Sequence, residues 1–429
     1  MKLFKPISIS LSPNTEKDDI LLALRLLFQP WRWKRTSFST AVGNSVQRLE
    51  GEFRKYLGVK YAVSFNSGRS ALLAILEAMD IKKDDEVLLQ GFTCNTAVTP
   101  ILAKGAKPVF VDVDETINMD PDDLKKKITL KSKVVMIQHT FGFPAKIDEI
   151  LKIARENNLF LIEDCAHSLG AEYKNRKVGI FGDAAFFSFG RDKIISSVFG
   201  GIAVTNDEKI GECLKEFQEK LDFPSYFWIL QQLLHPILMN YLILPAYGLN
   251  QYLGRVILGF CHKLSILSKA VSKKEKIGGI PEHFPKRFPN VLAILALNQF
   301  KKLAQFNKHR RDLANLYERE LKDAGLFLPL AKPQEGRMPV FMRYPILTDK
   351  NTDEILQNAR KRKIYLDDGW RKTPLVPPDT EIAKMEYNLG SCPRAEKIAK
   401  NIINLPTHIN ISQKEAKKIS DFLKNYFCI

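Results

Sequence analysis

The sequence predicts an α/β fold: a mostly parallel sheet with helices on both faces, followed by a smaller C-terminal α+β domain. Between residues 46 and 163, short apolar runs alternate regularly with stretches of helical period. This alternation is typical of parallel sheets, because each helix carries the chain back before the next strand begins. In residues 182–207, two apolar runs flank a polar turn, which predicts two further strands of the same sheet.

The expected elements follow the chain in order. An irregular arm, residues 1–45, holds one helix at 19–27. Helices of the large domain are expected at 45–57, 71–79, 96–104, 121–127 and 147–157, with a further helical region at 288–321. Its strands are expected at 61–65, 86–89, 108–113, 134–139, 160–163, 184–187 and 202–205.

The domain boundaries follow from these elements. The large domain takes residues 46–221 and 281–322, and an apolar insertion, residues 222–280, interrupts it. The small domain, residues 323–429, is expected to hold a strand at 343–347, a helix at 352–363, a segment at 398–405 and a closing helix at 413–426.

The chain is strongly basic, with 65 Lys and Arg against 48 Asp and Glu and a net charge of +17. This balance favours anionic partners such as nucleotides, phosphates or acidic lipids. The basic residues are dispersed, and the sequence has no zinc-finger spacing, RNP motif or basic-aromatic platform. We therefore expect no nucleic-acid partner.

The cysteine pattern and the N-terminus bear on the cellular compartment. No two of the cysteines form a CxxC pair, so we expect no metal site, and their scatter suits reduced thiols. The first residues lack the continuous apolar core of a signal peptide, which indicates a cytoplasmic protein. The six cysteines are Cys94, Cys165, Cys213, Cys261, Cys392 and Cys428.

One lysine, Lys193, lies on the polar turn between the last two expected strands. Such a lysine is partly desolvated, which favours its free amine, and a free amine can form a Schiff base with a carbonyl. Asp164 ends a buried strand, where open α/β sheets bind ligands. Together with Ser188, these residues suit pyridoxal phosphate: the lysine bonds the aldehyde, the acid pairs with the ring nitrogen and the serine helps to hold the phosphate. For a single lysine the alternative is a solvated loop residue.

A candidate phosphate site lies after the strand expected at 61–65. The chain passes through a glycine-containing turn, residues 66–70 with Gly68, Arg69 and Ser70, into the start of the helix expected at 71–79. Free backbone amides and the helix dipole at such a start attract phosphate. Many α/β turns contain Ser and Gly, so the pattern alone also allows a purely structural turn.

Five motifs make the chain resemble a known family. In order they are FNSGRSALLAIL, GAKPVFVDVD, EDCAHSLGAEY, FFSFGRDKIISSVFGGIAVTND and SCPRAEKIAKNIINLPTH. With them the chain resembles the DegT/DnrJ/EryC1/StrS family of pyridoxal-phosphate-dependent sugar aminotransferases, which have the fold-type I, aspartate-aminotransferase-like architecture. The resemblance implies a seven-stranded sheet and covers nearly the whole chain except the insertion.

The resemblance implies roles for individual residues. Lys193 matches the lysine that bonds the cofactor, and Asp164 matches the acid that pairs with its ring nitrogen; these two are the expected catalytic residues. His167 stands where the family places a residue near the ring hydroxyl. The residues that match the phosphate-binding positions are Ser188, Gly68, Arg69 and Ser70.

Three positions near the cofactor depart from the family pattern. Arg69 stands where the family usually has threonine, so its guanidinium could reach the phosphate or point away. Cys94 stands where many members have an aromatic ring that stacks on the cofactor, which leaves Phe92 as a substitute. Phe199 replaces a common glutamate before the Gly200–Gly201 pair.

The implied reaction moves an amino group, with glutamate as the donor, to a keto sugar linked to a nucleotide, in glycan or cell-surface polysaccharide biosynthesis. Trp370 and Arg371 are candidates for substrate contacts. The family also implies a homodimer with its active site at the subunit interface. An asparagine usually crosses from the partner subunit to the phosphate; Pro285 falls near that position, and Asn290 is close by.

Two other functions remain open. The first is sugar 3-dehydration with the same cofactor, but family members with that chemistry typically carry histidine at the lysine position. The second is a catalytically silent, membrane-associated scaffold. Lys193 argues against the first alternative, and the intact set of Lys193, Asp164 and Ser188 argues against the second.

The insertion contains an uncharged run, residues 223–254, that is long enough to suggest a membrane span. Polar residues interrupt this run, and Pro236 and Pro245 are expected to divide it into helices too short to cross a bilayer. The run therefore predicts short amphipathic helices.

We expect these helices, within residues 223–262, to lie in the membrane interface at the inner face of the membrane. Tyr226, Trp228 and Tyr241 would anchor them, and lysines follow downstream. The alternative is that the helices pack on the dimer or over the pocket, because apolar patches mark protein contacts as readily as membranes.

Overall fold

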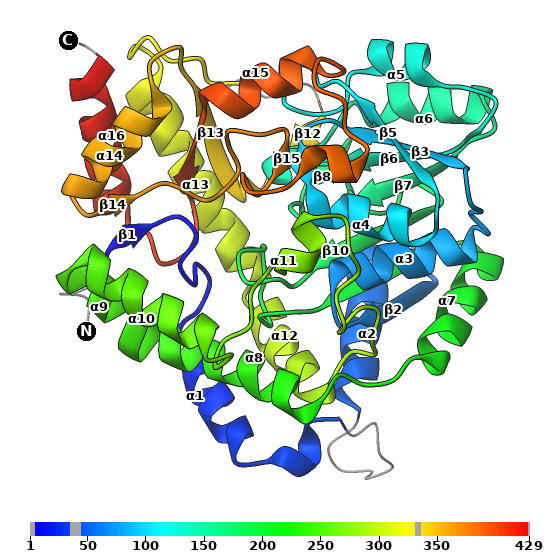
Figure 1. Ribbon diagram of the computed structural model, residues 1–429, viewed down its shortest axis with the longest axis horizontal. Coiled ribbons are helices and arrows are strands. Elements are labelled where there is room, and N and C mark those ends of the chain that lie inside the picture. The colour runs from blue at the N-terminus through cyan, green and yellow to red at the C-terminus, as the bar shows by residue number, and fades with distance from the viewer. Residues whose placement is uncertain (1–4, 35–43, 331–335, 428–429) are drawn as a thin grey trace.

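A seven-stranded sheet forms the centre of the large domain in the computed structural model, which describes residues 5–34, 44–330 and 336–427 (Figure 1). The strand order is β2–β11–β10–β7–β6–β3–β5. Strand β11 runs antiparallel to both of its neighbours, and the other pairs are parallel, which confirms the predicted sheet. The strands are β2 (Tyr61–Phe65), β3 (Glu86–Gln90), β5 (Lys107–Val111), β6 (Ser132–Gln138), β7 (Phe160–Asp164), β10 (Ala184–Ser188) and β11 (Gly201–Thr205).

Side-chain caps determine where the flanking helices begin. Helix α3 begins at Gly68, before the expected residue 71, because the Ser67 hydroxyl accepts a hydrogen bond from the Ser70 N–H. The first turn of α3 therefore follows directly from β2 and points its free amides toward the carboxyl edge of the sheet. The helices of this half are α2 (Ser45–Leu57), α3 (Gly68–Ala78), α4 (Asn95–Ala103), α5 (Pro121–Lys127), α6 (Ile147–Glu156) and α7 (Glu208–Lys220).

The helical region expected at 288–321 is two helices, α12 (Asn290–Phe300) and α13 (Leu303–Leu321), which are separated at Lys301 and Lys302. Helix α13 joins the two hydrophobic cores. Its first residue, Leu303, packs in the core of the sheet, whereas Leu313 and Tyr317 pack in the core of the small domain. The C-terminal half of α13 therefore belongs to the small-domain core by its packing.

The small domain lies beyond α13, with the C-terminal helix at the upper left of Figure 1. Its centre is an antiparallel pair, β13 with β16, covered by α14 and α16. Short parallel pairs tie it to the rest of the chain: β1 with β14 and β4 with β15. Its elements are β13 (Arg343–Leu347), α14 (Thr352–Lys361), β14 (Ile364–Tyr365), β15 (Leu375–Val376), η4 (Ile382–Met385), α15 (Pro393–Asn401), β16 (Ile402–Pro406) and α16 (Gln413–Phe427).

The remaining short elements complete the described chain. Strands β8, β9 and β12 form a small antiparallel sheet beside the large one. The N-terminal arm contributes α1, and parts of that arm, residues 1–4 and 35–43, lie outside the described residues, as does Cys428. The elements are β1 (Ile7–Ser8), α1 (Lys17–Leu27), η1 (Pro30–Arg32), β4 (Thr93–Cys94), η2 (Thr140–Gly142), β8 (Glu172–Tyr173), β9 (Arg176–Lys177) and β12 (Arg337–Met338).

The insertion is helical, but its prolines do not divide it as the sequence predicted. Helices α8 (Tyr226–Leu238), η3 (Met239–Ile243) and α9 (Leu244–Leu249) form one continuous 24-residue helix. Pro236 lies inside α8, and its own carbonyl accepts a hydrogen bond from the Asn240 side chain. Pro245 directly follows the π-helical turn η3, where the regular α-helical hydrogen-bond pattern is already interrupted.

By length and composition this 24-residue helix could cross a bilayer. However, 61% of its most apolar 18-residue stretch is buried inside the protein. The prediction that Trp228 anchors the helix in a membrane is wrong, because its side chain is buried against Phe199 and His283. The chain then turns at Asn250 into α10 (Gln251–Lys263), and a short helix, α11 (Lys273–Lys276), closes the insertion.

Candidate active site

A small cavity lies at the carboxyl edge of the large sheet, where Asp164 ends β7 and Ser188 ends β10. Lys193, on the loop after β10, and Gly68, at the start of α3, line the same cavity. The four groups that the sequence singled out from separate stretches therefore meet in one place. The other lining residues are Arg69, Cys94, Thr96, Ala97, Gln138, Ala166, His167, Phe186 and Trp370.

The cavity has a volume of about 60 Å³. Pockets for small molecules are usually about 300–1,000 Å³. Side chains around the cavity must therefore move to admit a ligand of cofactor size. Trp370 lines the cavity from the small domain, and Arg69 lines it from α3.

Lys193 is held on its loop by a chain of ion pairs that reaches the small domain. Its side chain is mostly buried, and Nζ lies 3.9 Å from a carboxylate oxygen of Asp192. The other oxygen of Asp192 lies 2.6 Å from the guanidinium of Arg343 on β13. Arg343 in turn contacts Asp368 at 3.0 Å. The position of the lysine loop is thus linked to the docking of the small domain.

Asp164 is a buried acid with few hydrogen-bond donors around it. Among the described residues it accepts one hydrogen bond, at 2.9 Å from the Ala166 N–H. Burial raises the pKa of Asp164 to about 6, although the Ala166 N–H and the charges of Lys193 and His139 act in the opposite direction. A carboxylate in this condition gains from a positive partner in the cavity, such as a protonated ring nitrogen.

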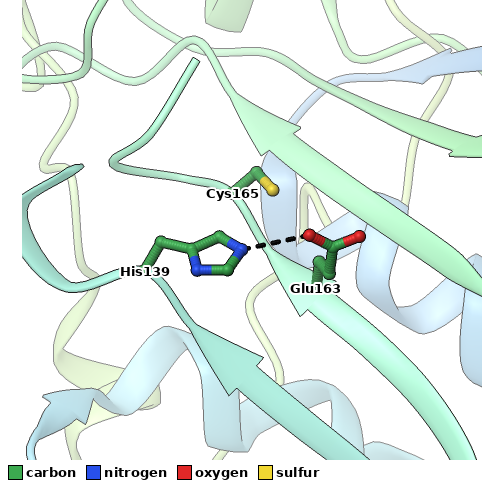
Figure 2. Close-up of side chains that lie close together, drawn as sticks. All are labelled: His139, Glu163 and Cys165. Carbon is green, nitrogen blue, oxygen red and sulfur yellow. Dashed lines mark hydrogen bonds and ion pairs between the residues drawn. The ribbon is translucent and has the colours of Figure 1, made fainter. Parts of the chain in front are cut away.

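The neighbouring acid, Glu163, makes a different set of contacts. Figure 2 shows Glu163 facing His139 and Cys165, and the His139 Nε2 lies 3.1 Å from Glu163 Oε2. The oxygens of Glu163 also accept hydrogen bonds from the backbone N–H groups of Gly179, Phe181 and Gly182. Burial alone would raise the pKa of Glu163, but the His139 and backbone contacts outweigh it, and the net pKa is lowered.

The three side chains in Figure 2 have the residue types of a metal site. The His139 Nδ1 already accepts a hydrogen bond from the Ala145 N–H, so the proton lies on Nε2 and is donated to Glu163. Burial raises the pKa of the Cys165 thiol well above its usual value. A deprotonated cysteine and a free carboxylate are what a metal needs, so this cluster is better explained as a brace for the end of β7.

His167 lies on the cavity wall with its ring between two aromatic side chains. It stacks parallel to Phe141 with ring centres 5.9 Å apart, and Trp370 meets it edge-on at 4.8 Å. Its Nδ1 accepts a hydrogen bond from the Phe141 N–H. Burial, together with the charges of Lys193 and Arg343, holds the pKa of His167 well below its usual value. The ring is therefore neutral and carries its proton on Nε2, as a donor.

The start of α3 approaches the sheet closely enough to require glycine. A Cβ on Gly201 would lie 2.4 Å from the backbone nitrogen of Gly68, and a Cβ on Gly68 would lie 3.0 Å from the Cβ of Ser188. Gly201, which follows the lysine loop, thus makes room for the first turn of α3, whereas Gly200 packs against the rings of Phe288 and Phe189. This packing places the amides of that turn beside the Ser188 hydroxyl.

Arg69 points away from the start of α3 toward the insertion. Its guanidinium forms an ion pair with the buried Glu275 of α11 and donates to the carbonyl of Ala270 at 2.8 Å. Burial lowers the pKa of Arg69 to about 10, so the group stays charged at neutral pH. The ring of Phe199 lies 5.9 Å from this guanidinium. The guanidinium therefore points away from the candidate phosphate site, which is one of the two orientations that the sequence left open.

Four residues that the sequence singled out do not reach the cavity. Arg371 does not line the cavity, and its guanidinium donates to Thr352 and Asp353 on α14. Phe92 is fully buried against Phe141 and Trp370. The other two are Ser70, whose N–H and hydroxyl bond Ser67 and Asn66, and Asn290, whose side chain bonds Ser45 and Arg32.

Sequence reasoning missed Gln138, Thr96 and Glu275. Gln138 is the last residue of β6, one strand over from Asp164, and its Oε1 accepts from Thr93 at 2.6 Å. The alternation of side chains in a strand could have found it, because His139 points to the Glu163 side instead. Nothing in the local sequence signals that Glu275 pairs with Arg69, since the two are far apart along the chain.

A comparison with known families decides the class of this site. The sequence model of the DegT/DnrJ/EryC1/StrS aminotransferase family matches residues 32–220 and 262–424 of the chain. The chain belongs to this aminotransferase family. Its members depend on pyridoxal phosphate, and the match breaks off between residues 220 and 262, within the insertion.

Two curated relatives illustrate the family's range. The chain is 27% identical over 395 residues to GDP-perosamine synthase of Escherichia coli O157:H7, across 91% of this chain and 93% of that protein. It is 32% identical over 287 residues to the spore coat polysaccharide biosynthesis protein SpsC of Bacillus subtilis, across 64% of this chain and 68% of that protein. The family thus includes enzymes of amino-sugar and polysaccharide synthesis.

Solved aminotransferases share the fold along nearly the whole chain. The aminotransferase from Psychrobacter cryohalolentis superimposes with a TM-score of 0.73 at 21% identity, covering 99% of both chains. The Helicobacter pylori aminotransferase PseC superimposes with a TM-score of 0.72 at 23% identity, also covering 99% of both chains. At these identities the likeness establishes the fold, including the mixed seven-stranded sheet.

Proposed function

We propose that this aminotransferase moves an amino group from glutamate to a keto sugar carried on a nucleotide, with pyridoxal phosphate as its cofactor. The observation that carries the proposal is the meeting of Lys193, Asp164, Ser188 and the start of α3 in one cavity. A family relative that is 27% identical over 388 residues is named dTDP-4-dehydro-2,3,6-trideoxy-D-glucose 4-aminotransferase, which supports a nucleotide-linked sugar as substrate.

The donor set of the cavity suits each part of the cofactor. The first-turn amides of α3 and the Ser188 hydroxyl would hold the phosphate, because a helix start attracts anions. Asp164 would hold the proton on the ring nitrogen, and the Nε2–H of His167 can donate to an oxygen on the ring. Lys193 would bond the aldehyde. When bound, the cofactor supplies an electron-accepting ring that stabilises negative charge at the adjacent substrate carbon.

The residues around the cavity would then have separate roles in the reaction. The Lys193 amine, once free, takes a proton from the α-carbon of the amino donor and later returns one to the sugar carbon. Asp164 remains ionised, so that the ring nitrogen keeps its proton. Trp370 and Phe141 pack around His167, which keeps water from that wall of the cavity and fixes the direction of the Nε2–H.

The partners and compartment complete the proposal. We place the enzyme in the cytoplasm, in agreement with the five described cysteines, which are all free thiols. We also propose a homodimer, as in the family. The segment around Pro285 packs on its own subunit: the carbonyls of His283 and Lys286 accept from Asn66. Pro285 has no side-chain donor for a phosphate, so a partner subunit would need another residue to reach one.

The test is transfer itself. Purified full-length protein, supplied with pyridoxal phosphate, is incubated with glutamate and a panel of nucleotide-linked keto sugars, and mass spectrometry follows the products. The expected result is an amino sugar from at least one substrate and an equal amount of 2-oxoglutarate. A protein that binds the cofactor but transfers nitrogen from no amino donor would overturn the proposal. Analytical sedimentation of the same sample tests the homodimer.

A further inference from the structure

The outward face of α10 is apolar, which is unusual for a helix on a protein surface. Tyr252, Val256 and Phe260 follow one another at four-residue spacing and are 67%, 68% and 58% exposed. The opposite face is the buried one: Gly254 packs so closely on Tyr247 that a Cβ there would lie 2.3 Å from the ring, and Cys261 is buried. The exposed apolar side chains of α10 are Tyr252, Leu253, Val256 and Phe260, with Leu249 at the end of α9 and Leu264 just after α10.

Helix α1 and the turn after it carry a second exposed apolar stripe. Leu21, Leu24, Phe28 and Trp31 repeat at helical spacing and are 40–74% exposed. Helix α1 packs on α8, α8 continues into α9, and α9 packs on α10. Figure 1 shows these helices along the lower left of the molecule, across from α5 and α6. Both stripes thus belong to one helical layer outside the family core.

The charges on α10 and the segment around it are of one sign, whereas the acids of α1, Asp18 and Asp19, pair with Lys302. Residues 223–274 contain no Asp or Glu, and the first acid that follows, Glu275, is buried in its ion pair with Arg69. Two of the basic residues, Arg255 and Lys263, lie on α10 itself between the apolar positions. The basic residues of the segment are Arg255, Lys263, Lys269, Lys273 and Lys274, and all are exposed.

This charge pattern distinguishes between two possible occupants. A second copy joined through a two-fold axis would set the same patch against itself, so Arg255 and Lys263 would face like charges with no acid to pair them. An anionic bilayer surface instead supplies the opposite charge and a hydrocarbon boundary for the apolar side chains. The pattern of apolar stripe plus basic residues therefore fits a lipid surface.

We propose that α10 binds the surface of a membrane that contains acidic phospholipids. The helix lies parallel to the bilayer, with Tyr252, Val256 and Phe260 below the headgroups and Arg255 and Lys263 at the phosphates. Thirteen residues form a helix of about 20 Å, which suits an in-plane position rather than a crossing. The stripe on α1 is a second point of contact. The proposal does not depend on the aminotransferase reaction.

The experiment is vesicle flotation of the full-length protein. Vesicles of phosphatidylcholine with 30% phosphatidylglycerol are compared with pure phosphatidylcholine at about 50 and 500 mM NaCl. We expect flotation with the acidic vesicles at low salt and a marked loss at high salt. A wild-type protein that stays in the soluble fraction under all conditions overturns the proposal.

Variants assign the binding to α10. Val256→Ser combined with Phe260→Ser should lower the partition coefficient at least about tenfold. Arg255→Gln combined with Lys263→Gln should lower it about fivefold per residue, and only with acidic vesicles. The matched control, Leu389→Ser, removes another exposed leucine, 74% exposed and outside this layer, and should leave flotation unchanged.

Two measurements keep the outcome clear. Circular dichroism and the thermal midpoint show whether each variant is folded, and the side chains changed are exposed, so folding should persist. Sedimentation shows the oligomeric state. If the α10 variants dissociate a dimer while flotation is unaffected, the face is an interface between copies and the lipid proposal is wrong. Phe28→Ser with Trp31→Ser should give a further loss of flotation, and no loss would confine the contact to α10.

Discussion

Two carboxylates, Glu163 and Asp164, follow one another at the end of β7 and face opposite sides of the sheet. Glu163 accepts three backbone hydrogen bonds and one from His139, and its pKa is lowered. Asp164 accepts one backbone hydrogen bond, and its pKa is raised to about 6. Both acids are buried, so the number of donors, rather than burial, separates them.

This difference separates a structural acid from a reactive one. The carboxylate oxygens of Glu163 accept hydrogen bonds from the loop 179–182 and from His139, and these bonds hold the end of β7 in place. Asp164 faces the cavity with Lys193 and His167. Its carboxylate has few hydrogen-bond donors, so a positively charged group of a ligand would stabilise it. Adjacent residues on a strand point to opposite faces, so one strand end serves both purposes.

The largest change expected on the reactive side is Lys193→Ala. It removes the amine that bonds the cofactor and moves the proton, so turnover should fall by about 10⁴-fold or more. The Glu163 side is untouched, and the thermal midpoint of the cofactor-free protein should stay near that of the wild type. Steady-state transfer assays and thermal melts check both statements. Near wild-type turnover would remove Lys193 from the mechanism.

Asp164→Asn should slow turnover by about 10²–10⁴-fold while cofactor is still retained. The same change should stabilise the cofactor-free protein. The folded pKa of about 6 lies above the ordinary 3.8, so the buried carboxylate costs stability above pH 6, and this cost disappears as the pH falls toward 4. The gain at pH 7.5 should be roughly 3 kcal/mol. Chemical denaturation at pH 7.5 and 4.5 measures it; equal turnover would make Asp164 a structural acid.

Glu163→Gln makes the same chemical change one residue earlier and should have the opposite effect on stability. An amide cannot accept from His139 and three backbone N–H groups as a carboxylate does, so about 3 kcal/mol should be lost. Because the pKa of Glu163 is lowered, this contribution is present above pH 4.5 and is lost as the pH falls. Chemical denaturation of the Glu163→Gln and Asp164→Asn variants under the same conditions measures the two changes in the free energy of unfolding. Two changes of the same sign would remove the distinction between the acids.

The smallest effect concerns pH. Below pH 6 the carboxyl of Asp164 becomes protonated in the cofactor-free protein, and binding of a protonated ring must then displace that proton. Cofactor affinity should fall by up to about tenfold per pH unit below 6. Titration followed by absorbance at pH 4.5–7.5 tests this, with Asp164→Asn as the control in which this dependence disappears.

The strands, the reactive lysine and Asp164 could be predicted from sequence because each is encoded locally. Apolar runs determine the strands, and the ends of parallel strands share an edge of the sheet, so Asp164 and Ser188 had to lie near each other. The turn that holds the candidate phosphate site was found from its serine and glycine, although α3 begins at Gly68 rather than at the expected residue 71. Family motifs then added the roles that geometry alone does not supply.

The errors concern partners that are distant in sequence. Arg371 follows Trp370 directly, but only Trp370 faces the cavity, because Arg371 meets Asp353 on a helix formed elsewhere. Trp228 lies in an apolar run that suggested a membrane, yet the body of the protein covers it. Pro236 did not break its helix, which continues through the π-helical turn η3 into α9. Local patterns carry no information on such contacts.

The ion pair between Arg69 and Glu275 constrains how this chain can vary through evolution. Arg69 stands at a position where threonine is usual in the family, and its charge is matched by a buried acid just beyond α10. A return to threonine alone would leave Glu275 buried without a counter-charge, at a cost of about 3–5 kcal/mol. The two positions can therefore change only together, and related chains that keep the arginine should also keep the acid.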